Sequence, residues 1–93
     1  MHISLLVVTL RLHGCASLKE KRRRVRGVMS KLSASPNLAV CESGYQNDLQ
    51  TAEWSFVCGA LTSALVEQSF DVVERSILER VDGEIVHIER SRL

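Results

Sequence analysis

Apolar residues dominate the first predicted element, a strand over residues 3–12. Aliphatic and β-branched side chains occur there at both odd and even positions, which is typical of a central strand that is covered on both faces. The even-numbered positions form the cleaner apolar set and should face the helices. These positions are Leu6, Val8, Leu10 and Leu12.

A first helix is predicted after a turn, because Ser17 is followed three residues later by Glu20, the spacing of a capping box. One stripe of this helix is apolar and can pack against a sheet. Its members are Leu18, Val25, Val28, Met29 and Leu32. Lys21 and Arg22 flank the stripe, so we expect their stems to line the core edge while their charges reach water. Pro36 should end the helix by residues 33–35.

The chain then predicts two strands joined by a polar loop. Residues 38–42 form a short strand that is more polar than the first, as is typical of a sheet edge. Residues 43–50 are polar and too many for a tight hairpin. Residues 52–61 predict a third strand, in which Trp54 and Phe56 share one face.

A second helix is expected from residue 62 or 63, because apolar residues recur at spacings of three and four. These residues are Val66, Phe70, Val73, Ile77 and Val81. The outer face of the helix is acidic, with Glu67, Asp71, Glu74 and Glu79. Residues 85–90 predict a last alternating strand, with Val86 and Ile88 directed inward.

The order strand, helix, strand, strand, helix, strand describes two similar halves. Right-handed crossovers place the first and third strands side by side and parallel in the middle, with the second and fourth strands at the edges. The pattern predicts a ferredoxin-like α+β sandwich, in which two helices cover one face of a four-stranded antiparallel sheet. The length of 93 residues fits a single domain over residues 1–93.

Two helices on one face leave the other face of the sheet open. We expect that face to carry four large apolar side chains, Leu5, Val7, Trp54 and Phe56. A patch of this size is uncommon on the surface of a monomer. The sequence therefore predicts that this patch is buried, either in a homodimer formed through the open sheet face or by another partner.

The composition and the cysteine spacing indicate the cellular compartment of the protein. Apolar residues make up 45% and charged residues 25% of the chain, which is typical of a soluble folded protein. Cys15, Cys41 and Cys58 are odd in number and form no Cys-x-x-Cys pair, so we expect free thiols in a reducing cytosol. The apolar run at residues 3–12 has no preceding Lys or Arg and is too short to cross a bilayer. We therefore expect a cytoplasmic protein with no membrane partner.

Charge is distributed very unevenly along the chain. Residues 1–31 contain eight Lys or Arg against Glu20 alone, a net charge of +7, whereas residues 32–93 contain four against ten acids, a net charge of −6. The densest part is residues 17–26. Its cations are Lys19, Lys21, Arg22, Arg23, Arg24 and Arg26. Cations in the first turn of a helix are disfavoured by the helix dipole, so these residues are the candidate polyanion-binding site.

Two explanations for the basic stretch stay open. Backbone N–H groups at a helix start, surrounded by Lys and Arg, suit the oxygens of phosphate, with ribosomal RNA or a ribosome as the partner. Alternatively, the cations pair with Glu67, Asp71 or Glu74 of the second helix, or with acids across a dimer. The predicted sheet lacks the paired aromatics of base-stacking strands, so any RNA contact should be to phosphate and shape.

The segment at residues 16–23, placed after an aliphatic first strand, resembles the signature of the YlxP-like family of small bacterial proteins of unknown function. The resemblance covers nearly the whole chain. Matching positions in the second hairpin are Val40, Glu42, Gln46, Gln50, Ala52 and Glu53. The resemblance implies a ferredoxin-like fold, no established enzymatic activity and genes that often lie beside those for translation and ribosome maturation factors. The loop at residues 44–49 departs from the family pattern and lacks several of its polar groups.

No pattern indicates a reaction. His13, Cys15 and Glu20 are close in sequence, but a turn His and Cys beside a capping Glu are usually incidental, so no metal site is predicted. Asp48 and Glu53 are a weak acid/base pair without a nucleophile or phosphate loop. We therefore expect no catalytic residues and no cofactor. The predicted function is a non-enzymatic RNA- or ribosome-binding accessory factor, and the alternative is a homodimeric protein-interaction module with no nucleic-acid role.

Overall fold

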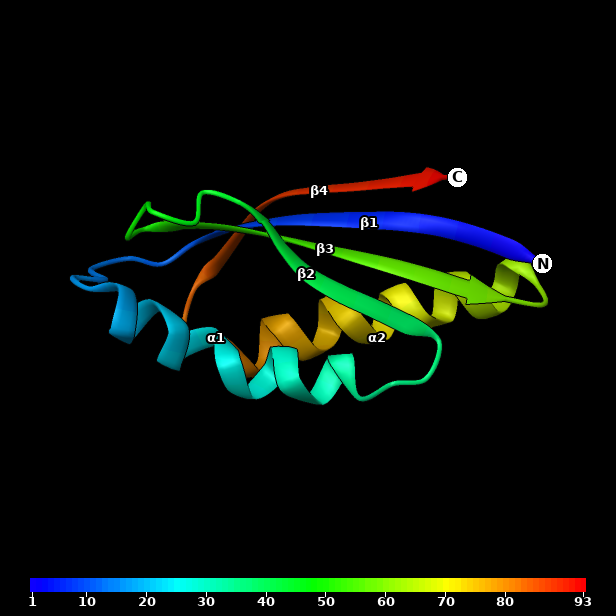
Figure 1. The fold of residues 1–93 in the computed structure, drawn as a ribbon, viewed down its shortest axis with the longest axis horizontal. Coiled ribbons are helices and arrows are strands. Elements are labelled where there is room, and N and C mark those ends of the chain that lie inside the picture. The colour runs from blue at the N-terminus through cyan, green and yellow to red at the C-terminus, as the bar shows by residue number, and fades with distance from the viewer.

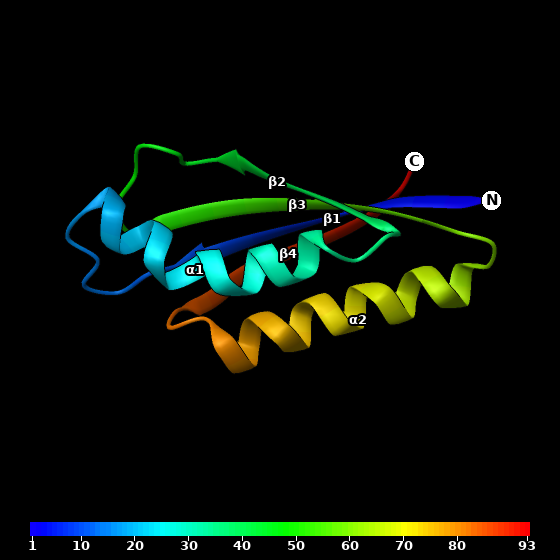
Figure 2. The same cartoon turned by 60° about the horizontal axis from the view of Figure 1, so that its bottom comes forward.

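The structure is a computed structural model that describes residues 1–93, and it has the predicted ferredoxin-like fold. Its strands are ordered β2-β3-β1-β4, and every neighbouring pair is antiparallel. Figures 1 and 2 show both helices on the same face of the sheet. Neither helix is long and apolar enough to cross a membrane. The elements are β1 (His2–Arg11), α1 (Leu18–Ser33), β2 (Leu38–Gly44), β3 (Thr51–Ala60), α2 (Ser63–Arg80) and β4 (Glu84–Arg92).

The relative direction of the two central strands differs from the prediction. β1 and β3 were expected to be parallel, and they are antiparallel neighbours. Each helical crossover returns the chain to its original direction, so β2 runs parallel to β1 without touching it. The β2–β3 hairpin then reverses the chain once, and β3 must run against β1.

The hydrophobic core lies between the sheet and the two helices. The side chains predicted to face the helices from the first strand and its end are completely buried, namely Leu6, Val8, Leu10 and Leu12. Each helix adds one apolar stripe. These stripes contain Val25, Val28, Met29 and Leu32 of α1, and Val66, Phe70, Val73 and Ile77 of α2. Burial of each large side chain of this kind stabilises the fold by about 1.5–3 kcal/mol.

Trp54 and Phe56 lie on the helix-covered face, so their predicted place on the open face is wrong. The register of β1 and β3 sets Phe56 opposite Leu6 and Trp54 opposite Val8. Phe56 is completely buried, and Trp54 packs against the core. Directly opposed residues share a face, so this register separates both aromatic residues from Leu5.

Leu5 and Val7 remain on the open face, as predicted. Leu5 lies opposite Val57 of β3, and Val57 lies opposite Ala39 of β2. Together with Ile3, these residues form an apolar stripe across three strands. The open face therefore carries a short apolar stripe without an aromatic side chain, and polar residues such as Ser55 and Glu89 lie opposite Val7 beside it.

The inward set of β4 also differs from the prediction. An irregularity beside Thr9 shifts the pairing, so that Thr9 faces His87 while Leu10 faces Ile85. Ile85 packs against the core and Val86 is exposed, so Val86 was predicted wrongly. Ile88 lies opposite the buried Val8, on the predicted face. A bulge of this kind changes which side chains point inward, and it cannot be found from alternation alone.

Candidate polyanion-binding surface

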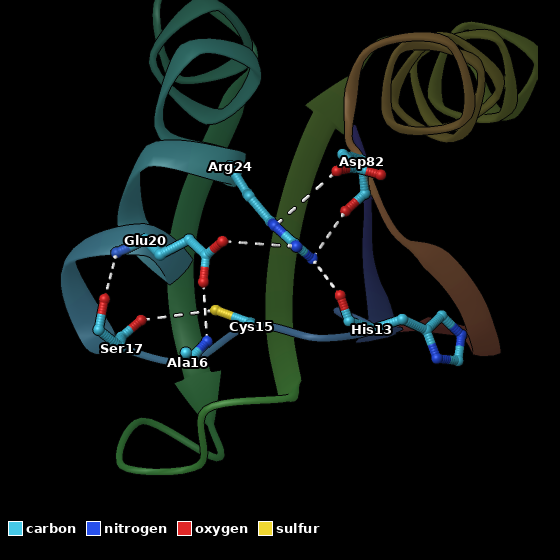
Figure 3. A network of polar contacts seen from close by, with 7 residues as sticks. All are labelled: His13, Cys15, Ala16, Ser17, Glu20, Arg24 and Asp82. Carbon is cyan, nitrogen blue, oxygen red and sulfur yellow. Dashed lines mark hydrogen bonds and ion pairs between the residues drawn. The ribbon is translucent and has the colours of Figure 1, made fainter.

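Ser17 and Glu20 form the predicted cap at the start of α1. The Ser17 hydroxyl accepts a hydrogen bond from the backbone N–H of Glu20 at 3.1 Å. The Glu20 carboxylate reaches back and accepts from the backbone N–H of Ala16 at 2.7 Å, one residue before the cap (Figure 3). This hydrogen bond, helped by Arg24 and Arg23, holds the pKa of Glu20 below its usual value. The cap consumes backbone donors that a phosphate would otherwise meet.

Arg24 was predicted to belong to the polyanion-binding site, but its guanidinium is engaged by contacts within the protein. Its guanidinium donates to the backbone carbonyl of His13 at 2.9 Å and to that of Asp82 at 3.5 Å. It also lies 3.7 Å from a carboxylate oxygen of Glu20 and 3.9 Å from one of Asp82. Figure 3 shows that these contacts join the start of α1 to the turn between α2 and β4. Arg24 therefore holds three segments of the fold together.

Lys21 is buried, so the prediction that its charge reaches water is wrong. Only 2% of the residue is exposed, and its ammonium donates to the backbone carbonyls of Tyr45 at 2.6 Å and Asp48 at 2.7 Å. The loop between β2 and β3 folds over the helix start and supplies these acceptors. Position 21 lies three residues after Leu18 and four before Val25, so its place within the apolar stripe was readable from the spacing.

Four candidate cations remain on the surface of α1 without an ion pair. We call them the exposed basic surface, and they are Lys19, Arg22, Arg23 and Arg26. The structure thus divides the six predicted residues into four that are free and two that hold the fold. Of the six predicted residues, these four are the ones that are exposed to an anion in solution.

The acidic face of α2 is paired with β4. The Arg90 guanidinium donates to Glu67, to Asp71 at 2.9 Å and to Glu74, and it lies 5.5 Å from the ring centroid of Phe70. Burial lowers the pKa of Arg90, but the hydrogen bonds to Glu74 and Asp71 outweigh it and raise the pKa above its ordinary value. The proposed pairing of these acids with the cations of α1 is therefore wrong within one chain.

Sequence reasoning missed Arg90 as the partner of these acids. Arg90 lies opposite Leu6 in the sheet, on the side that faces α2. An inward position on the last strand was the available signal, because an arginine there needs acidic partners from the covering helix. The cation that pairs with these acids thus comes from β4, the strand that directly follows α2 in the chain.

Nearly the whole chain matches one known family. Residues 3–90 match the family described as "Protein of unknown function (DUF503)". The chain belongs to this DUF503 family. A comparison with curated proteins finds no match.

Solved structures similar to this DUF503 protein share its fold at low sequence identity. A structural genomics protein, YJCS, is 7% identical with a TM-score of 0.64 and covers 98% of both chains. A putative antibiotic biosynthesis monooxygenase from Chloroflexus aurantiacus is 11% identical with a TM-score of 0.60, over 98% of this chain and 92% of that one. A de novo designed protein with a ferredoxin fold is 15% identical with a TM-score of 0.59, over 99% and 84%. These likenesses show the fold alone.

The other candidate side chains of this DUF503 protein are not gathered into one site. The His13 ring contacts Glu84 at 3.0 Å, whereas Cys15 is buried and its thiol contacts the backbone carbonyl of Ser17 at 3.4 Å. The Asp48 carboxylate accepts from two backbone N–H groups where β3 begins. No group of three His, Cys, Asp or Glu side chains is arranged to hold a metal ion.

Proposed function

We propose that this DUF503 protein is a non-enzymatic cytoplasmic accessory factor that binds RNA or the ribosome through the exposed basic surface of α1. One observation carries the proposal. The four cations of that surface form no ion pair, while three acids of the neighbouring helix, Glu67, Asp71 and Glu74, pair with Arg90. An unpaired cluster of cations on a rigid helix attracts a polyanion from outside the chain.

The position of the aromatic residues supports contact with phosphate. Trp54 and Phe56 face the helices, so they are not available for base stacking on the open sheet. Binding through Arg and Lys to phosphate oxygens is independent of base sequence and weakens as salt rises.

The resemblance to YlxP-like proteins supports ribosomal RNA as the polyanion. Genes of that family often lie beside genes for translation and ribosome maturation factors. The signature at residues 16–23 includes Lys19, Arg22 and Arg23, three members of the exposed basic surface. Two other residues of this signature, Ser17 and Glu20, form the helix cap that orients them.

Filter binding to ribosomal RNA at increasing salt tests the proposal. Four phosphate contacts predict a slope of log affinity against log salt of about −3. A variant with Arg22→Glu, Arg23→Glu and Arg26→Glu should lose at least about 100-fold in affinity and most of the slope. The matched control reverses three exposed arginines elsewhere, Arg75, Arg80 and Arg92. Equal losses in both variants, or binding that does not respond to salt, would exclude a specific site on α1.

A homodimeric interaction module is the second candidate, favoured by the apolar stripe on the open face. Leu5 and Val57 lie opposite each other there, and no helix covers them (Figure 1). Light scattering should give twice the monomer mass of 10.4 kDa, and Val57→Lys should return the mass to that of one chain. Trp54 variants do not test this interface, because that side chain lies on the other face.

A further inference from the structure

Beside the exposed basic surface, a groove of about 490 Å³ lies between α1 and the edge strand β2. Val40 and Trp54 of the sheet supply part of its apolar lining. Arg22 and Arg26, one helical turn apart, line it from α1, and Glu42 lines it from β2. Its volume falls within the usual range of small-molecule sites, about 300–1,000 Å³.

The charged side chains that line the groove form no ion pairs with one another. Arg22 and Arg26 are exposed and form no ion pair, and the carboxylate of Glu42 forms none either. The groove therefore offers two donors for an anion and one separate acceptor for an N–H group. A ligand that satisfies both ends must carry negative charge at one end and a hydrogen-bond donor at the other.

Trp54 adds an aromatic ring and an unused donor. The indole N–H of Trp54 is buried and has no hydrogen-bond acceptor in the protein. A buried polar group without a partner is uncommon in folded proteins and calls for an explanation. The ring that carries it lines the groove, as the two free arginines do.

We propose that this groove binds one nucleotide. The base packs against the apolar lining at Trp54, the phosphate accepts hydrogen bonds from Arg22 and Arg26, and Glu42 accepts one from an exocyclic amino group of the base. A free mononucleotide and an unstacked nucleotide of RNA present the same chemistry. For RNA as the source, the inference rests on the proposed function and adds a base contact to it.

The Glu42 contact predicts which bases bind best. Adenine, guanine and cytosine carry an exocyclic amino group, and uracil does not. Uridine monophosphate should therefore bind about tenfold more weakly than adenosine or cytidine monophosphate. Glu42→Gln should remove most of this difference, because its amide can also donate.

Tryptophan fluorescence measures binding at this groove directly, because Trp54 is the only tryptophan of the chain. The protein is titrated with adenosine, cytidine and uridine monophosphates and with a short single-stranded RNA. Saturable changes with mononucleotides identify the free nucleotide as a ligand, and changes with RNA alone identify a nucleotide within RNA. No change with either ligand, or an equal change with inorganic phosphate or polyglutamate, would overturn the proposal.

A matched pair of variants separates the groove from the surrounding charge. Ser30→Phe adds a ring to an exposed position that lines the groove and leaves the charge unchanged. It should weaken the response to nucleotide by at least about tenfold. Ala64→Phe adds the same ring at an exposed position of α2 and should leave binding unchanged, with circular dichroism confirming both folds.

The two proposals fail in different ways. Salt-dependent RNA binding without a change in Trp54 fluorescence would overturn the proposal that the groove binds a nucleotide. It would not contradict the proposed function. A response to mononucleotides without RNA binding would support the groove and overturn the proposed function. Equal effects of Ser30→Phe and Ala64→Phe would remove the assignment to this groove.

Discussion

The two helices lie on the same face of the sheet (Figure 2), but they differ in whether their exposed charges are paired within the chain. In α2, three acids converge on Arg90 of β4. In α1, the exposed basic surface has no acidic partner in the chain. Both helices have strongly charged outer faces in the sequence, but only the acids of α2 share a cation from a neighbouring strand. A run of charge therefore indicates an external partner only after the internal partners have been identified.

The largest expected effect on stability comes from removing Arg90, the cation that pairs with the acids of α2. Arg90→Met should lower the free energy of unfolding by about 3 kcal/mol, because three carboxylates lose their cation while Glu74 remains partly buried. Arg22→Met on the free side should change it by less than about 0.5 kcal/mol. Urea denaturation of both variants measures the difference. Equal destabilisation would mean that the cations of α1 are also engaged in the fold.

Lys21 tests the buried part of α1. Lys21→Met should cost about 2 kcal/mol of stability, because two backbone carbonyls of the loop lose a charged donor. Lys19→Met, two residues earlier and exposed, is the matched control and should be nearly neutral. Urea denaturation gives the stabilities, and hydrogen exchange of the loop should rise in the Lys21 variant alone. Unchanged exchange there would contradict the role assigned to Lys21.

Arg24 should show a smaller effect of the same kind. Arg24→Gln should lower the free energy of unfolding by about 1 kcal/mol, through loss of its contacts with His13 and Asp82. Arg23→Gln removes the same charge from an exposed position and should leave stability within about 0.5 kcal/mol. In RNA binding the order should reverse, with Arg23→Gln the weaker binder. If Arg24→Gln and Arg23→Gln had the same effects in both assays, the distinction between free and structural cations would be wrong.

The smallest effect concerns the pH dependence of the helix cap. Glu20 has a folded pKa below its ordinary value of 4.5, so its contribution to stability is present above that value. It is lost as the pH falls through the lower folded pKa. NMR titration should show this depressed pKa, and Glu20→Gln should flatten the stability profile in that acidic range. A titration at or above pH 4.5 would contradict the hydrogen bond to the Ala16 N–H.

Local features were predictable from the sequence because their causes lie within a few residues. Ser17 and Glu20 cap α1 across three positions, and the buried residues of β1, Leu6, Val8 and Leu10, follow a period of two. The order of elements followed from the change between these periods, and the fold followed from that order. The free and the structural cations of residues 17–26, in contrast, have similar neighbours in the sequence, so the local sequence does not distinguish them.

Tertiary structure alone decided which charges remain free and which face carries Trp54. Arg90 meets the acids of α2 because β4 lies beside β1, a pairing between distant parts of the chain. Trp54 faces the helices because the register of β3 against β1 pairs even-numbered residues with each other, and a shift of one residue would have reversed every side chain. The sequence by itself determined the helix cap, the core stripes and the order of the elements. Long-range pairing determined the exposed basic surface and the groove beside it, because both depend on contacts between residues far apart in the chain.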